Sequence, residues 1–389
     1  MGRGRQRAKK ITMKKYFTII AILTLGQPAI AQPSGTQSYK NELQRSIDKG
    51  LRFLEQSQNK EGYWLDPDHP AITALCLMAY HSNPKKPKAE SAWVKKAYGH
   101  ILKQKQKDGS IYAPGKGLAN YNTALCLMAL VASENPAYTD TAKQARAYLV
   151  RQQWDLGKKK EQDHPLDGGI GYGNRYPHSD LNNTLTAIEA IYYSRHLIAD
   201  SPEAKNDLNW GAAIQFIQNC QNLPTHNKQP WVSNDPKHKG GFIYFPGKSM
   251  AGEEKGKNGK TALRSYGSIS YAGMLSYAYA KLDKNDPRVK AVFTWISDNY
   301  TLAENPNMGQ QGLFYYYFLM TKALSIHGAD ELNVKGKKIN WRRELSMQFL
   351  KMQNEDGSWQ NDNPRWWEKE KPLVTAYGLI ALSYIHRGL

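Results

Sequence analysis

Four polar residues near the middle of the chain carry groups suited to proton transfer. Arg264 can hold a carboxylate, while Tyr266 and His178 can remove a proton, as in a lyase that acts on an acidic sugar. Asp180 lies two residues after His178 and adds a carboxyl group before an apolar segment. Their spacing does not show that they meet, so these residues are candidates only.

A second candidate is the acidic stretch "DPDHPA" at residues 66–71. Asp68 or His69 can cap a helix that has Pro70 in its first turn. A carboxylic acid here acts as a strong proton donor only where a dry site holds it in the protonated form. The stretch therefore favours a helix cap, with an acid catalyst as the alternative.

Aromatic residues are a third resource, because the chain has 24 Tyr and an unbroken aromatic run at residues 314–318. Ring faces stabilise a cation by roughly 2 kcal/mol each in a dry cavity, but they also stack on sugars or fill a core. Successive helical residues point about 100° apart, so only part of the run can face one cavity. We expect Tyr315, Tyr316 and Tyr121 to line it.

The elements that must position these residues are revealed by a repeat. The heptapeptide "TALCLMA" occurs at residues 73–79 and again at 123–129. Each copy follows an amphipathic segment and a polar turn, and similar but drifted units recur to the C-terminus. The pattern predicts six helix pairs between about residues 40 and 387, with Cys76 and Cys126 as small buried residues.

The two helices of a pair differ in pattern. The first has one apolar stripe, which includes Ile47, Leu51 and Leu54, whereas the second is apolar nearly all round. Two concentric layers satisfy both patterns, with the apolar helices inside. Because the last unit is as apolar as the first, we predict closure into an all-α toroid rather than an open solenoid. We place it in one domain, residues 32–389, with insertions near 157–178 and 221–260.

The N-terminus is typical of a secretory signal. From Met13 a basic pair precedes an apolar run and an Ala-x-Ala site that ends at Ala31. We predict that residues 1–31 are a signal peptide, with Met13 as an alternative start, and that the protein is exported to a bacterial periplasm or secreted. The apolar run is too short to span a bilayer, so no transmembrane segment is expected in the mature chain.

Charge points to the kind of partner. The chain carries a net charge of +19, and residues 1–31 hold seven Lys and Arg and no acid, which leaves +12 in the mature chain. A basic exported protein suits contact with a cell envelope, although solubility alone explains the charge equally well. No basic run has the pattern of a nucleic-acid module, so nucleic acid is not expected as a partner.

Turn residues carry a family resemblance. Gln58, Gly62 and Trp64 recur in the last unit as Gln353, Gly357 and Trp359, and they resemble the Gln–Trp repeat of squalene–hopene cyclases. The chain resembles the terpenoid cyclase and protein prenyltransferase superfamily, and two segments, 264–296 and 300–324, resemble exported bacterial proteins named for such repeats. The resemblance implies an α/α toroid in which Gln58, Trp64, Gln353 and Trp359 are structural.

The resemblance also bears on the site. It implies a cavity inside the ring that faces the starts of the inner helices. Alkene-protonating cyclases carry Asp-x-Asp-Asp-Thr-Ala before an inner helix. Asp66, Asp68 and Ala71 match that motif, and Asp68 takes the proton-donor position, but His69 and Pro70 depart from it. Protein prenyltransferases bind zinc through Asp, Cys and His, yet no Cys here lies in their motif. We therefore expect no metal and no cofactor.

Three functions remain open. The first is a cyclase-like or prenyltransferase-like enzyme acting on an isoprenoid or polycyclic lipid, and the second is a glycan-active enzyme. The third is a non-catalytic toroid that binds a lipid, cell-wall or protein ligand. A dry aromatic cavity with one acid favours the first, and an open groove with Arg, His and Tyr favours the second. A filled or shallow centre favours the third.

Overall fold

The computed structural model describes residues 34–86, 90–173, 176–255, 259 and 261–389. The predicted signal peptide, residues 1–31, and the alternative start at Met13 lie outside these residues. Twelve α-helices make up about half of the described residues, and they belong to one compact unit. None of the helices in these ranges combines the length and the apolar character needed to cross a membrane.

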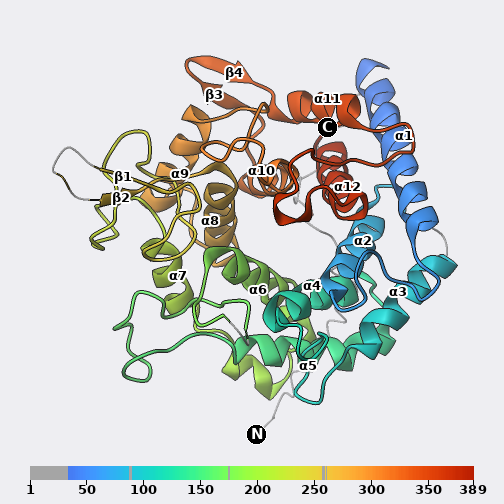
Figure 1. Ribbon diagram of the computed structural model, residues 1–389, viewed down its shortest axis with the longest axis horizontal. Helices are drawn as coiled ribbons and strands as arrows, with labels where there is room; N and C mark the ends of the chain where they lie inside the picture. The colour runs from blue at the N-terminus through green and yellow to red at the C-terminus, as the bar shows by residue number, and fades with distance from the viewer. Residues whose placement is uncertain (1–33, 87–89, 174–175, 256–258, 260) are drawn as a thin grey trace, which may run out of the picture. The chain divides into compact units, whose positions relative to one another are not determined.

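Six apolar helices form an inner ring (Figure 1). They are α2 (Pro70–Ser82), α4 (Ala119–Ala132), α6 (Leu181–Ser194), α8 (Gly267–Tyr279), α10 (Leu313–His327) and α12 (Lys371–Gly388). Each inner helix contacts the next, and α12 contacts α2, so the ring is closed. The predicted closure is therefore confirmed.

Six further helices form the outer layer and alternate with the inner ones along the chain. They are α1 (Ser34–Ser57), α3 (Ala92–Lys103), α5 (Thr139–Val150), α7 (Trp210–Asn219), α9 (Pro287–Asp298) and α11 (Trp341–Met352). Helix α1 shows why they stay outside: Ile47 and Leu54 are buried, whereas Arg52 and Glu55 are exposed. The predicted α/α toroid of six helix pairs is confirmed.

Short strands and 3₁₀ helices lie in the connections between the α-helices. Two antiparallel hairpins pair β1 (Glu253–Lys255) with β2 (Thr261–Leu263), and β3 (Leu332–Val334) with β4 (Lys337–Ile339). Four short 3₁₀ helices are η1 (Pro136–Tyr138), η2 (Arg195–Leu197), η3 (Pro202–Asn206) and η4 (Arg365–Trp367). The longest connections precede α6 and α8.

The repeated heptapeptide lies in the adjacent inner helices α2 and α4. Helices of the inner ring are covered on both sides, which requires apolar side chains all round. Cys76 and Cys126 are the small members of this packing, and both are fully buried free thiols. Burial raises the pKa of both thiols well above the usual value, because the thiolate is poorly solvated there.

We therefore expect Cys76 and Cys126 to resist alkylation in the native protein. The thiolate is the reactive form, and burial suppresses both its formation and reagent access. Iodoacetamide labelling followed by peptide mass spectrometry should modify them only after unfolding in guanidinium. Rapid native labelling at either site, or a disulfide between them, would contradict this prediction.

The Gln–Trp residues tie neighbouring outer helices together. The Gln58 side-chain amide donates to the carbonyl oxygens of Gly62 and Trp93, and the latter lies in α3. The Gln353 amide donates in the same way to Gly357 and to Ser46 of α1, which closes the ring.

The two Trp rings of the repeat are buried anchors. The indole N–H of Trp64 donates to the Leu54 carbonyl at 2.9 Å, and that of Trp359 donates to the Phe349 carbonyl at 2.8 Å. Both side chains are buried, so all their contacts are within the scaffold. These are the positions expected of structural residues.

The same turn recurs in the drifted units, with a long insertion between its parts. The Gln153 amide donates to the carbonyls of Gly168 and Asn209, and the Gln221 amide to those of Gly240 and Arg288. Gly168 and Gly240 have φ values of +83° and +96°. A Cβ at either would collide with a backbone carbonyl of the next outer helix, so glycine is required.

Candidate functional site

A cavity of about 410 Å³ lies at the N-terminal ends of the inner helices. Its wall includes residues from the starts of all six, as the resemblance implied. Nine of the 21 lining residues are Tyr or Trp, and they are Tyr121, Tyr172, Tyr176, Tyr244, Tyr266, Tyr315, Trp366, Trp367 and Tyr377. The non-aromatic lining is mainly aliphatic. The described lining residues include one carboxylic acid, Glu368, and neither Lys nor Arg.

Further along the inner helices, the described side chains enclose a much smaller space. Tyr121, Tyr315 and Tyr377 also line a second cavity of only about 20 Å³. An ion pair lines this second cavity: the Lys322 ammonium lies 2.5 Å from a carboxylate oxygen of Glu189. Both side chains are buried. The main cavity therefore has a tyrosine floor with a paired charge behind it.

Several of the lining tyrosines come from the long connections rather than from helices. Tyr172 and Tyr244 each lie four residues after a turn glycine, Gly168 and Gly240. The Tyr172 carbonyl accepts from the Asn120 N–H at the start of α4, and the Tyr244 carbonyl accepts from the Leu181 N–H at the start of α6. Each connection therefore caps an inner helix of the preceding unit and thereby holds its ring over the cavity.

Asp180 lies directly behind this tyrosine wall. It is the N-cap residue of α6, and its carboxylate accepts from the Asn183 N–H at 2.9 Å and the Asn183 side-chain amide at 2.7 Å. Burial raises the pKa of Asp180 to about 7, and hydrogen bonds from Asn183, Asn182 and the Tyr244 hydroxyl offset only part of that shift. Asp180 is thus half protonated near neutral pH and contacts a ring that lines the cavity.

Glu368, the acid of the lining, is committed to helix capping. Helix α10 begins after Gly312, which has no side chain to cap it, and the Glu368 carboxylate accepts from the N–H groups of Phe314 and Tyr315 instead. The Asn361 amide also donates to it at 2.6 Å. Burial raises the pKa of Glu368, and the hydrogen bonds from these donors oppose the increase.

Asp68 lies outside the cavity lining. Its carboxylate pairs with the Lys116 ammonium at 2.8 Å, and a third of its side chain is exposed. His69 occupies the N-cap position of α2 and lines the cavity, but its side chain makes no capping hydrogen bond. Pro70 is the first helical residue, as expected. The dry surroundings that a strong acid requires are found at Asp180 and not at Asp68.

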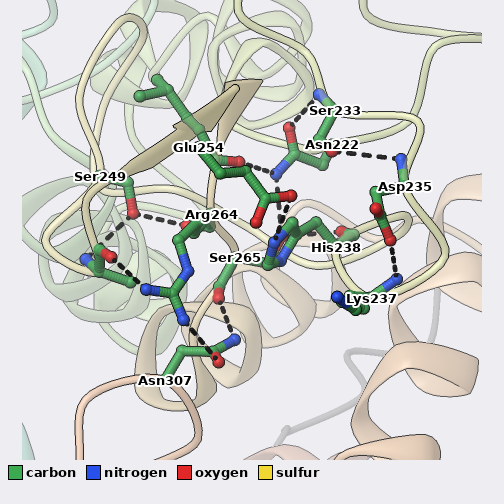
Figure 2. A network of polar contacts seen from close by, with 12 residues as sticks. Asn222, Ser233, Asp235, Lys237, His238, Ser249, Glu254, Arg264, Ser265 and Asn307 are labelled. Carbon is green, nitrogen blue, oxygen red and sulfur yellow. Dashed lines mark hydrogen bonds and ion pairs between the residues drawn. The ribbon is translucent and has the colours of Figure 1, made fainter. Parts of the chain in front are cut away.

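The proposed group of Arg264, Tyr266 and His178 is not assembled. Of these three described residues, Tyr266 alone lines the cavity. Figure 2 shows that the Arg264 side chain joins a polar network beside the insertion before α8. Its guanidinium donates to Asn307, in the connection before α10, at 3.2 Å. The His178 ring stacks on Phe245, with centroids 4.4 Å apart. Both side chains stabilise connections, so their prediction as a joint site with Tyr266 is corrected.

The aromatic predictions divide according to helix geometry. Tyr121 and Tyr315 line the cavity, and the Tyr315 hydroxyl donates to Asn182. Tyr316 is the next residue along α10, so it points elsewhere: its hydroxyl donates to the Thr301 carbonyl and its ring packs on Tyr271. The expectation that Tyr316 faces the cavity is therefore corrected.

Sequence reasoning missed Tyr172, Tyr244 and Tyr377 as lining residues. A signal was present for the first two, because both end the pattern Gly-Gly-x-x-Tyr, at 168–172 and 240–244. Tyr377 lies in α12, within an apolar run that reads as ordinary core. Among the described residues, no cluster of His, Cys, Asp and Glu has the arrangement needed to hold a metal ion.

The fold and the enclosed site define an α/α toroid with a central cavity. The chain is similar in structure to the type II terpene cyclase MstE from Scytonema in complex with its product merosterolic acid A, with a TM-score of 0.53 and 13% identity. The likeness covers 91% of this chain and 99% of that one. No family model and no curated protein sequence matches the chain.

Glycan-active toroids are similar to the same degree. The α-1,6-mannanase GH76A of Salegentibacter sp., in complex with α-1,6-mannotriose, has a TM-score of 0.56 and 10% identity, over 89% of this chain and 99% of that one. The GH76 α-mannanase of Bacteroides thetaiotaomicron has a TM-score of 0.52 and 12% identity, over 91% and 98%. These likenesses confirm the predicted fold, which two different chemistries share.

Proposed function

We propose that the protein is an enzyme that carries out acid-catalysed chemistry on an isoprenoid or polycyclic lipid held in the central cavity. The observation that carries the proposal is the aromatic cavity with Asp180 buried behind its wall. Aromatic rings bind an apolar ligand and stabilise positive charge that develops on it. A carboxyl group whose pKa lies near 7 is an effective general acid at neutral pH.

Tyr244 is the proposed route for the proton. Its ring lines the cavity, and its hydroxyl lies close enough to the Asp180 carboxyl group to lower the pKa of that group. The hydroxyl proton passes to a basic atom of the substrate while Asp180 delivers its own proton to the same hydroxyl oxygen. Tyr244 ends unchanged, the substrate carries the positive charge, and Asp180 is left as a carboxylate. The positively charged product then loses a proton to solvent, and Asp180 takes up a proton from solvent to return to its starting state.

A glycosidase mechanism fits the cavity less well. Most glycoside hydrolases need two carboxyl groups that both reach the scissile bond. Of the two acids at this site, Glu368 caps α10 and Asp180 is screened by tyrosines. A prenyltransferase-like reaction on a diphosphate would need cationic side chains, and none of the described lining residues is Lys or Arg.

Export is the second part of the proposal. It rests on residues 13–31, whose basic, apolar and Ala-x-Ala parts follow the order of a signal peptide. The mature chain then begins at Gln32 as one toroid domain, with the insertions near 157–178 and 221–260. Its net charge of +12 favours contact with an anionic cell envelope.

The acid is tested by Asp180→Asn, which keeps the size and capping ability of the side chain but removes the proton. We expect turnover of a linear isoprenoid substrate to fall at least about 100-fold without a lower melting temperature. Wild type and variant are incubated with linear isoprenoids and with α-1,6-mannotriose, and products are identified by mass spectrometry. Asp68→Asn is the matched control and should leave turnover unchanged, because Asp68 lies outside the cavity.

The outcomes separate the candidate functions. Isoprenoid products from Asp180→Asn at the wild-type rate would remove Asp180 from the mechanism, and loss in Asp68→Asn alone would transfer the role of acid to Asp68. Sugar products would identify a glycan-active enzyme. Binding of ligand with no product in either protein would leave a non-catalytic lipid-binding toroid.

A further inference from the structure

The mouth of the cavity carries exposed aromatic rings. Trp366, Trp367 and Tyr176 all line the cavity, yet they are 42%, 44% and 42% exposed. Within the part of the chain that the structure describes, the other exposed large apolar side chains are Leu65 and Met347, and neither lines the cavity. Exposed apolar surface therefore gathers where the cavity meets solvent, and such surface is typical of a binding site.

The two Trp residues have a backbone conformation that bulky side chains rarely adopt. Trp366 has φ +53° and ψ +33°, and Trp367 has φ +65°. This left-handed conformation costs free energy in a residue with a large side chain, and burial does not repay it because both rings are exposed. Backbone hydrogen bonds hold the turn, since the Trp367 N–H donates to the Pro364 carbonyl and the Trp367 carbonyl accepts from the Glu370 N–H. The strain thus keeps two rings at the mouth, which points to a ligand that uses them.

Neighbouring side chains orient both rings. Trp366 packs over Gly312 at the start of α10, where an added Cβ would lie 3.0 Å from the ring, and the Arg365 guanidinium lies 5.1 Å from the ring centroid. The Trp367 ring meets the His69 ring edge-on, with centroids 5.2 Å apart. The rest of the two indole rings is open to a ligand, and we call Trp366 and Trp367 the mouth shelf.

The acidic stretch "DPDHPA", which the proposed acid chemistry does not use, lies beside this shelf. Nε2 of His69, the residue that touches Trp367, lies 3.7 Å from the Asp66 carboxylate, and the Asp66 side chain is 39% exposed. The Asp68 N–H donates to Asp66 at 2.8 Å, and the Asp68 carboxylate pairs with Lys116. Exposed carboxylate oxygens accept hydrogen bonds from hydroxyl groups. The rim of the mouth therefore combines open ring surface with hydroxyl-binding groups.

This combination suits a sugar ring. A sugar has an apolar face of C–H groups, which packs against an indole, and hydroxyl groups around its edge, which can donate to the carboxylates. A bilayer surface fits less well, because insertion of the Trp pair would also take the carboxylates of Asp66 and Asp68 out of water. A phosphorylated head group would meet these two carboxylates, and the Lys116 ammonium is already paired with one of them.

We propose that the mouth shelf and Asp66 form a subsite for the sugar head group of a glycolipid whose apolar chain enters the cavity. This inference rests on the proposed function for the apolar chain, and it adds the class of ligand and its orientation. The sugar lies on the exposed rings, so the chain extends inwards to the tyrosine floor. The subsite contributes affinity and positioning, and no bond of the ligand is made or broken there.

The test compares amphiphiles that differ in head group. Geranyl β-D-glucoside, geranyl α-D-mannoside, geraniol and geranyl phenyl ether are titrated into the protein below their micelle concentrations, and dissociation constants are measured by calorimetry. n-Octyl β-D-glucoside and 1-octanol form a second pair with a chain that is not an isoprenoid. We expect the tighter geranyl glycoside and the octyl glucoside each to bind at least about 10-fold more tightly than the matching alcohol, because a stacked ring and a hydrogen bond to a carboxylate both add affinity. The phenyl ether can stack but cannot donate, so it should bind less tightly than the tighter glycoside.

Two variants locate the effect. Trp367→Gly removes a shelf ring and introduces a residue that adopts a positive φ without strain. It should lower the preference for the glycoside over geraniol at least about 3-fold while the melting temperature stays the same or rises, a combination that a purely structural ring would not give. Asp66→Asn keeps an acceptor for the Asp68 N–H but removes the charge, and it should lower the same preference. Met347→Ala is the matched control, because Met347 is exposed on α11 outside the cavity lining, and the preference should persist in it.

The outcomes distinguish the sugar subsite from the proposed function. Equal binding of geraniol and both geranyl glycosides by the wild type overturns the subsite and leaves the lipid cavity standing. Binding of the phenyl ether as tightly as the glycosides also overturns it, and so does sedimentation with phosphatidylcholine vesicles that Trp367→Gly abolishes without a change in glycoside preference. A preference for octyl glucoside over 1-octanol without any binding of the geranyl compounds supports the subsite and removes the isoprenoid from the proposed function. Failure of all these compounds to bind overturns both.

Discussion

Trp359→Ala lowers the free energy of unfolding by about 3–5 kcal/mol, the usual cost of deleting a large buried aromatic side chain. The Trp359 ring is fully buried, packs edge-on against Phe349 and donates its N–H to the Phe349 carbonyl. It lies at the seam where the last unit meets α1, because a side chain at Gly50 would touch it. Its loss leaves a cavity and an unpaired carbonyl at the point of ring closure. Urea denaturation followed by circular dichroism measures the change.

Trp366→Ala is the matched control. Trp366 is 42% exposed and lines the cavity, so its removal costs little burial and leaves the scaffold bonds intact. We expect a change of less than about 1 kcal/mol in stability, with weaker binding of an apolar ligand. If Trp359→Ala unfolds at the wild-type urea concentration, the Gln–Trp turn is not the element that holds the ring closed.

The fold could be predicted from the sequence because its determinants are local and repeated. A helix that is apolar all round must be covered on both sides, whereas a helix with one apolar stripe is covered on one side only. The two-layer ring therefore follows from the periodicity of the apolar residues. The Gln58 and Gln353 turns were recognisable because only a few residues separate each Gln from its Gly. The Gln153 and Gln221 turns were hidden because long insertions separate the same partners, although their contacts are the same.

The site was less predictable because its walls are built by connections. The start of each inner helix does face the cavity, which is why Tyr121 and Tyr315 could be named in advance as lining residues. The paths of the insertions depend on contacts with other units, so the sequence could not show that Tyr244 reaches Asp180. For the same reason it could not show that Arg264 turns away.

The protonation of Asp180 gives the other large expected effect, which is on the pH dependence of stability. Its pKa is about 7 in the folded protein against the ordinary value of 3.8, so the native state retains a proton that the unfolded chain has lost between these two pH values. Stability therefore falls as pH rises from about 4 to about 7 and is then constant, because the native state binds more protons. The pKa difference corresponds to a loss of about 4 kcal/mol in the free energy of unfolding across that range.

Asp180→Asn should remove this dependence, since the amide does not titrate. Relative to wild type, the variant gains stability steadily from pH 4 to pH 7, whatever constant offset the substitution introduces, and urea denaturation at half-unit pH intervals measures the difference. Asp286→Asn is the matched control: Asp286 caps α9, and its hydrogen bonds with Arg288 lower its pKa. A lowered pKa stabilises the fold above the unfolded value and is lost as pH falls, so this control loses stability relative to wild type as pH rises through the acid range. Parallel curves for wild type and Asp180→Asn between pH 4 and pH 8 would show that Asp180 is an ordinary ionised helix cap, and the proposed acid would then have no proton to give at neutral pH.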